Sequence, residues 1–174
     1  TLGNHEFDYR AKGLANMMNH AVESGDPLPE IVISNVDWDA MNAAGLTEDQ
    51  QMLFDAFENL GVKEYVVLEK GDVKVAVTGV FGKDCLACVV APPLVFQDPV
   101  EGLKETVAKI QENEEADMIV CVSHSGIWKD KAKSEDEILA KEVPELDLIV
   151  SAHTHTKLEE PIQPQYYGYD GEKI

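Results

Sequence analysis

Apolar residues first recur at helical spacing shortly after the N-terminal residues of this chain of 174 residues. The apolar positions of that segment are Leu14, Met17, Met18 and Val22. They fall on one face of a helix that we predict over residues 8–24, with Asp8 able to cap its start. Gly25 is expected to end the helix, because glycine adopts the left-handed conformation at little cost.

A run of β-branched residues at 31–36 follows, and it predicts a short buried strand. Residues 37–51 are acidic and rich in alanine, and they lead into an amphipathic segment. The apolar positions of this segment are Leu53, Phe54, Phe57 and Leu60. The region of about 37–62 has two interpretations, an insertion or lid within the domain or a packed surface helix, and the helical spacing favours the second.

Residues 64–68 and 74–80 are rich in β-branched residues and flank a Lys-Gly-Asp turn at 70–72, which predicts a hairpin. The remaining pattern alternates helix and strand, with elements at residues 98–113, 117–122, 134–141 and 148–150. Ser134 and Glu137 have the spacing of a capping box. Strands that alternate with helices predict an α/β layered sheet, in which the hairpin is an antiparallel element.

The net charge of the chain limits the classes of partner that it is expected to bind. The chain has 33 acidic and 14 basic side chains, a net charge of −19, without the lysine and arginine cluster that neutralises a phosphate backbone. A nucleic-acid polymer is therefore excluded as the expected partner, and no apolar run is long enough for a membrane span. A small phosphate ester is also an anion, so an acidic protein that binds one needs cations at the site.

Four of the five histidines lie in three short clusters, two of which follow predicted strands. The fifth, His20, lies within the first helical segment and is expected at the surface. Imidazole nitrogens and amide oxygens bind zinc, manganese and iron. The candidate ligands are Asn4, His124, His153 and His155. Because ligands gather at the carboxyl ends of strands in open α/β sheets, we expect these side chains to converge.

The motifs that carry this chemistry resemble those of a known family. Gly-Asn-His-Glu-Phe-Asp-Tyr at residues 3–9, the His124 cluster and the His-x-His pair at 153–155 resemble the last three motifs of the calcineurin-like metallophosphoesterases. The Glu-Phe-Asp extension resembles the 5′-nucleotidase branch. The resemblance implies a layered β-sandwich flanked by helices. Residues 1–174 would form part of that catalytic domain, incomplete at both ends, with residues 171–174 opening a further strand.

The resemblance also implies roles for single residues. Asn4, His124 and His153 would bind the second of two metal ions, and His155 the first. His5 would contact the phosphoryl group and stabilise charge or protonate the leaving group. Asp8, three residues further on, would orient the His5 imidazole, as in the catalytic dyad of the 5′-nucleotidases.

The family also has an Asp-x-His and a Gly-Asp motif that precede these three and supply most of the first metal site and the bridging carboxylate, and we expect both to lie outside residues 1–174. We therefore expect two divalent ions, zinc, manganese, iron or similar, in the parent protein. This chain alone should hold one ion or none and be inactive or weakly active. Two departures concern glycine: Ala152 stands before the His-x-His pair, and Arg10 follows Tyr9, where the family usually has glycine.

The leading hypothesis is a phosphoesterase whose parent protein hydrolyses nucleotide 5′-monophosphates. The alternatives are a 2′,3′-cyclic nucleotide phosphodiesterase, another phosphomonoesterase or sugar-nucleotide hydrolase, and a non-catalytic domain that kept the fold. A zinc or redox protein centred on Cys85 and Cys88 is weaker, because the pair lacks a second Cys-x-x-Cys, and incidental thiols are favoured. The family resemblance implies an extracytoplasmic location, and missing strands would allow association through exposed sheet edges.

Overall fold

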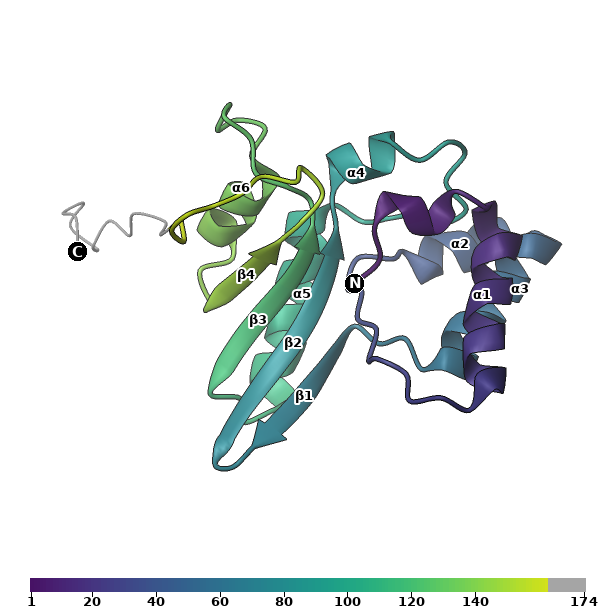
Figure 1. Cartoon of the computed structure of the whole chain (residues 1–174), viewed down its shortest axis with the longest axis horizontal. Coiled ribbons are helices and arrows are strands. Elements are labelled where there is room, and N and C mark those ends of the chain that lie inside the picture. Colours follow the sequence, from purple (N-terminus) through teal and green to yellow (C-terminus); the bar gives the residue numbers. More distant parts are fainter. Residues whose placement is uncertain (163–174) are drawn as a thin grey trace.

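The computed structural model describes residues 1–162 and has the α/β architecture that the sequence predicts (Figure 1). Its helices are η1 (Asn4–Phe7, a 3₁₀ helix), α1 (Arg10–Ser24), α2 (Trp38–Ala44), α3 (Glu48–Leu60), α4 (Lys83–Ala87), α5 (Pro99–Asn113) and α6 (Glu135–Glu142). Its strands are β1 (Tyr65–Lys70), β2 (Val73–Phe81), β3 (Met118–His124) and β4 (Leu148–Ser151). The strand start predicted at 171–174 lies outside the described residues.

The four strands form one sheet in the order β1-β2-β3-β4. The predicted hairpin is confirmed, since β1 and β2 pair antiparallel, whereas β2, β3 and β4 are parallel to one another. Phe81 pairs with His124 across β2 and β3, and Ser123 pairs with Ser151 across β3 and β4. The carboxyl ends of the three parallel strands are therefore level, which brings the residues that follow them to one edge of the sheet.

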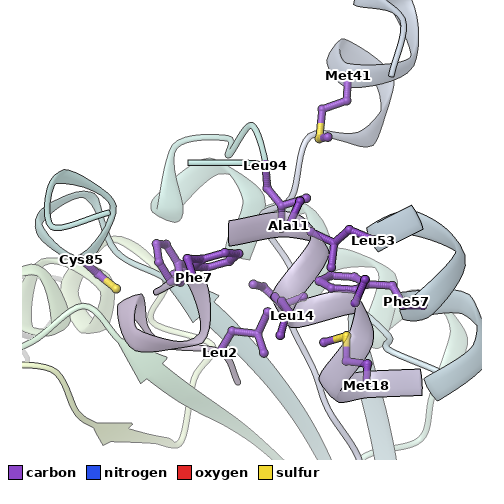
Figure 2. Close-up of a cluster of buried hydrophobic side chains, with 14 residues drawn as sticks. Leu2, Phe7, Ala11, Leu14, Met18, Met41, Leu53, Phe57, Cys85 and Leu94 are labelled. Carbon is purple, nitrogen blue, oxygen red and sulfur yellow. The ribbon is translucent and has the colours of Figure 1, made fainter. Parts of the chain in front are cut away.

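Two hydrophobic clusters lie on opposite faces of β2, because successive side chains of a strand point to opposite faces. Val80 belongs to the cluster that α5 and α6 form with the sheet. Phe81 belongs to the cluster built with η1, α1 and α3 (Figure 2). Leu53 and Phe57 of α3 are buried against α1 in this second cluster, so the C-terminal helix of the segment of residues 37–62 packs onto α1.

The prediction of a strand at residues 31–36 is wrong, because this run forms only two isolated β-bridges. Val32 pairs with Lys63, and Val36 pairs with Phe96. In between, Ile33 and Ser34 donate their backbone N–H groups to the carbonyls of Lys63 and of residue 79, at 2.8 and 2.7 Å. The apolar run is buried as expected, but its backbone groups are shared among three segments, so no ladder with one partner strand forms.

Two predicted helix caps are also wrong. Helix α1 begins after Asp8, with Tyr9 as its N-cap, and the Asp8 carboxylate contacts His5 instead. Ser134 is the N-cap of α6, but its hydroxyl accepts a hydrogen bond from a backbone N–H of the preceding loop at 3.1 Å, and the capping box does not form. The predicted stop at Gly25 is confirmed by its left-handed φ of 71°.

The length and apolar content of the helices decide whether one of them could cross a membrane. Among the helices in residues 1–162, none combines the length and the apolar content that crossing a membrane requires.

Candidate metal centre

Three of the predicted ligands meet where η1 approaches the ends of β3 and β4. The Oδ1 atom of Asn4 lies 3.2 Å from Nε2 of His124. The rings of His124 and His153 are 5.2 Å apart between centroids. Asn4 is the first residue of η1, His124 the last residue of β3, and His153 follows β4 by two residues. The structure thus brings these three side chains together, and their role as metal ligands stays a prediction.

His155 lies beside the other histidines. It lines a cavity of about 160 Å³ together with His124 and His153. The backbone of the connecting loop is unusual, since His153 and His155 have φ angles of 78° and 53°, in the left-handed region. Such conformations cost roughly 1–3 kcal/mol each and persist where the surroundings hold them. Ala152 does not adopt a positive φ, so alanine can replace the family's glycine there without backbone strain.

Close packing of η1 on β3 explains the glycine of the first motif. A Cβ atom on Gly3 would lie 2.7 Å from Cε1 of His124, closer than such atoms approach. The backbone N–H of Gly3 donates to the Glu6 carboxylate at 2.5 Å, which closes the turn in front of Asn4. Glu6 therefore shapes the turn that presents the Asn4 amide.

One buried carboxylate ties the ends of β3 and β4 together. Oδ1 of Asp136, in the first turn of α6, accepts a hydrogen bond from the Ser123 hydroxyl at 2.5 Å. Oδ2 accepts from the Ser151 hydroxyl and from the backbone N–H of Gly126 at 3.1 Å. Asp136 is only 4% exposed, so water competes little for these bonds.

The position of this carboxylate matters for the histidines. Ser123 directly precedes His124, and Ser151 lies two residues before His153. The two imidazoles are therefore spaced by strand pairing and by a side-chain bridge at the same level of the sheet. Asp136 therefore acts on the strand ends that carry the two histidines, and not on the imidazole rings themselves. Asp136 could not be singled out beforehand, because the chain has 33 acidic side chains and burial of this one depends on the packing of α6.

Helix α4, which the sequence did not predict, adds two further groups. The Asp84 carboxylate lies 3.0 Å from Nε2 of His153. The Cys85 sulfur lies within 4.8 Å of donor atoms of His124 and His153. The sequence did not indicate Asp84, and it suggested Cys85 only as a partner of Cys88, because both residues are near the histidines in space and distant from them in sequence.

Burial sets the protonation of these groups. Desolvation, followed by the proximity of His153, lowers the pKa of His124, which favours the neutral imidazole that binds metals. Desolvation raises the pKa of Cys85 to about 12, so its thiol is protonated at neutral pH in this structure. The hydrogen-bond contact with Asn4 acts in the opposite direction and is the smaller influence.

His5 and Asp8 form a pair at the surface beside this cluster. Nδ1 of His5 lies 3.0 Å from Oδ2 of Asp8, within the short turn of η1. Their side chains are 78% and 59% exposed, so both are open to solvent. The contact matches the geometry expected of an imidazole oriented by a carboxylate, and its role in catalysis stays a prediction.

Comparisons with known proteins agree with this fold and motif set. The family model of the calcineurin-like phosphoesterases matches residues 1–157. The chain belongs to this family, and it carries a hydrolase fold of the metallophosphoesterase type. It is 32% identical to the trifunctional nucleotide phosphoesterase protein YfkN of Bacillus subtilis over 169 residues, which cover 90% of this chain and 11% of that protein.

Two more relatives place the chain near the 5′-nucleotidases. A 5′-nucleotidase of Vibrio cholerae is 27% identical over 164 residues, 88% of this chain and 25% of that protein. The crystal structure of a 5′-nucleotidase precursor from Thermus thermophilus is 26% identical, with a TM-score of 0.63 over 89% of this chain and 25% of that chain. The chain thus spans a quarter or less of the length of these relatives.

The donor set fits the divalent metals that calcineurin-like phosphoesterases use. Neutral imidazoles and an amide oxygen suit zinc, manganese or iron, and the nearest donors are already in mutual contact, at 3.2 Å between Asn4 and His124.

Proposed function

We propose that the parent protein hydrolyses nucleotide 5′-monophosphates and that this chain supplies one side of its dinuclear metal centre. The observation that carries the proposal is the convergence of η1, β3 and the loop after β4, which gathers the predicted ligands at one sheet edge. Relatives named nucleotide phosphoesterase and 5′-nucleotidase support a nucleotide substrate.

Asn4, His124 and His153 would hold one divalent ion, and His155 would contribute to the other. This assignment follows the family resemblance, and the contacts among the first three support it. When bound, such ions polarise the phosphoryl oxygens and lower the pKa of a bound water. The chain's part is to hold the donors in place, which the Asp136 bridge and the tight approach of Gly3 accomplish.

His5 would act on the substrate itself. With Nδ1 held by the Asp8 carboxylate, the other ring nitrogen of His5 is free to face a phosphate ester. That nitrogen would donate a hydrogen bond to a phosphoryl oxygen and pass its proton to the leaving alkoxide. Asp8 would stabilise the charged imidazolium before the transfer, as a carboxylate does beside histidine.

The expected substrate is a small phosphate ester. The net charge of −19 argues against a nucleic-acid polymer, because anionic partners need a local excess of positive charge. The extracytoplasmic location implied by the family is part of the proposal, and the word precursor in the name of the Thermus thermophilus relative supports it. Association through exposed edges of the sheet is also proposed, since β4 ends the sheet with only four residues.

Hydrolysis of AMP with added Mn²⁺ tests the proposal. We expect release of phosphate by a longer form of the protein that carries the Asp-x-His and Gly-Asp motifs, and little or none by the chain of 174 residues. Replacing His153 by Ala in the longer form should abolish the activity. Parallel assays with 2′,3′-cyclic AMP and a sugar nucleotide distinguish the other esterases. A longer form that is inactive on all three substrates would favour the non-catalytic domain.

A further inference from the structure

Helix α4 brings a carboxylate to one of the two ring nitrogens of His153. The helix follows β2 at the sheet edge where the predicted ligands gather (Figure 1). Oδ2 of Asp84 lies 3.0 Å from Nε2 of His153. An ionised carboxylate only accepts hydrogen bonds, so this contact requires a hydrogen on Nε2. In the neutral imidazole Nδ1 is then bare, and it is the nitrogen with which the ring can bind an ion.

The turn between β2 and α4 fixes the position of this carboxylate. Two backbone N–H groups at the start of α4, one of them from Asp84, donate to the Glu135 carboxylate of α6 at 2.8 and 3.0 Å. Gly82 donates its N–H to the carbonyl of His124 at 3.2 Å. A Cβ atom on Gly82 would lie 2.5 Å from Cα of Ser125, so the turn packs directly on the chain that leaves β3. Asp84 is therefore held against α6 and the end of β3.

The orientation of the His153 ring depends on this carboxylate. Asp136 bridges the strand ends through two serine hydroxyls and does not act on the ring. Among the residues that the structure describes, Asp84 is the side chain that shares a hydrogen bond with this imidazole. The neighbouring cation Lys83 pairs with Asp98 at 2.6 Å, so it does not draw the Asp84 carboxylate away from the ring. The imidazole is only 10% exposed, which limits competition from water.

We propose that Asp84 is a positioning residue of the metal centre, which fixes His153 in the tautomer and orientation that present Nδ1 to an ion. The inference rests on the metal centre of the proposed function and adds a partner that lies outside the sequence motifs. A carboxylate on the second nitrogen of a ligating imidazole holds the ring and raises its basicity. Because Asp84 contacts the nitrogen that faces away from the ion, the ion's remaining positions stay open for a water molecule and a bridging group.

Two kinds of substitution separate the possible effects of this carboxylate. Asp84→Asn keeps an oxygen that can accept from Nε2 but removes the charge, whereas Asp84→Ala removes both. Their difference therefore measures the acceptor apart from the negative charge, which attracts any cation. The exposed thiol of Cys88 also lies within 4.8 Å of donor atoms of Asp84 and His153. Cys88→Ala is thus a matched control that changes the surroundings and keeps the contact.

Nitrogen NMR of the zinc-free chain of 174 residues tests the contact without any metal. Two-bond correlations between ring protons and nitrogens identify the tautomer at pH 9, well above the usual imidazole pKa of about 6.5. The signals of His153 are those lost in His153→Gln. We expect a hydrogen on Nε2 in the unchanged chain, in Cys88→Ala and in Asp84→Asn, and a mixture of both tautomers in Asp84→Ala. A mixture in the unchanged chain, or a single unchanged tautomer in Asp84→Ala, would overturn the role of Asp84 and leave the ligands of the proposed function intact.

Zinc titration of the longer form measures what this orientation contributes to the metal centre. Asp84→Ala should bind zinc about tenfold to a hundredfold more weakly than the unchanged protein. Asp84→Asn should recover part of the loss, and Cys88→Ala should show none. Circular dichroism checks that each variant is folded. Equal zinc affinities in the two Asp84 variants would overturn the positioning role, and a longer form that binds no zinc would overturn the metal centre of the proposed function together with it.

Discussion

The sheet edge and the N-terminal turn present histidines in opposite ways. His153 is 10% exposed in its side chain and lies in a loop whose strand is bridged by Asp136. His5 is 78% exposed and has one carboxylate partner three residues away. The first arrangement suits a group that must hold an ion at fixed distances. The second suits a group that must meet a substrate from solvent. The exposed fraction of the side chain therefore separates the predicted metal ligand from the predicted catalytic residue.

The largest expected effect concerns the exposed histidine. His5→Ala in the longer, active form should lower the rate of AMP hydrolysis about a hundredfold to ten-thousandfold, the usual contribution of positioned acid catalysis. Zinc or manganese content and the unfolding midpoint should not change, because the side chain is exposed. Steady-state kinetics with metal analysis measures both.

Asp8→Asn separates orientation from charge in the same pair. It keeps a side-chain oxygen that can accept from Nδ1 of His5 but removes the negative charge that stabilises the imidazolium. We expect a smaller loss of rate than in His5→Ala. A His5→Ala variant of undiminished activity would show that exposure at this turn has nothing to do with proton transfer.

Asp136→Ala should have the largest effect on the buried side of the comparison. It leaves the Ser151 hydroxyl and the Gly126 N–H without an acceptor, and each orphaned buried group costs about 1–3 kcal/mol. The Ser123 hydroxyl can still donate to the Ser125 oxygen at 2.9 Å. We expect the free energy of unfolding to fall by about 3 kcal/mol in urea titrations. Metal affinity, measured where the variant is folded, should fall about 10-fold to 100-fold.

Asp136→Asn is the control for this variant. The amide keeps one acceptor for the Gly126 N–H and can donate to a serine hydroxyl, so most of the network can re-form. We expect it to recover most of the stability. Equal metal affinity in Asp136→Ala and the unchanged protein would show that strand pairing alone spaces the imidazoles.

A smaller effect on the free energy of unfolding is expected from a surface ion pair at the start of α5. A hydrogen bond and ion pair with Lys83, at 2.6 Å, lowers the pKa of Asp98, which also caps α5 through the Val100 N–H at 2.9 Å. A lowered folded-state pKa gives stability that is present above the unfolded value of about 3.9 and is lost as pH falls through the folded value. Asp98→Ala should therefore destabilise by about 1 kcal/mol at pH 7 and by less below pH ~4.

Urea unfolding at pH 7 and at pH 3 measures this difference. Glu101→Ala removes an exposed ion pair with Lys104 on the same helix and serves as the control. Its effect should stay within about 0.5 kcal/mol at both pH values. A destabilisation by Asp98→Ala that is larger at pH 3 than at pH 7 would contradict the sign derived from the lowered pKa.

The smallest effect concerns backbone strain in the N-terminal turn. Arg10 has a φ of 58°, which costs an L-residue about 1–2 kcal/mol and glycine almost nothing. Arg10→Gly should stabilise by less than about 1 kcal/mol, because the greater freedom of glycine in the unfolded chain offsets part of the relief. Thermal unfolding measures the gain, and Arg10→Ala, which keeps the strain, should show none.

The sequence predicted the elements whose signals are local. The alternation of β-branched residues gave the hairpin and the parallel strands, and Gly25 gave the end of α1. The apolar run at 31–36 was wrongly predicted as a strand because pairing partners are a tertiary property. Ser134 failed as a capping side chain because its hydroxyl meets a loop N–H first.

The candidate site divides in the same way. The motifs indicated Asn4, His124 and His153, since strand ends of a parallel sheet meet at one edge. Asp136 could not be found, because nothing in its sequence neighbourhood distinguishes a carboxylate that packing will bury between two strand ends, and the position of Cys85 near two histidines is likewise a tertiary property. Sequence motifs identify the predicted ligands, and the folded chain is needed to find what surrounds them.

The bridge between β3 and β4 also constrains how this chain can diverge. Replacing Ser123, Asp136 or Ser151 alone leaves a buried polar group without its hydrogen-bond partner. Replacing all three by apolar groups of similar volume can leave the free energy of unfolding nearly unchanged. Homologous chains are therefore expected to inherit the three positions as a set, either wholly polar or wholly apolar. A lineage with only part of the set must have acquired another way to hold its strand ends level.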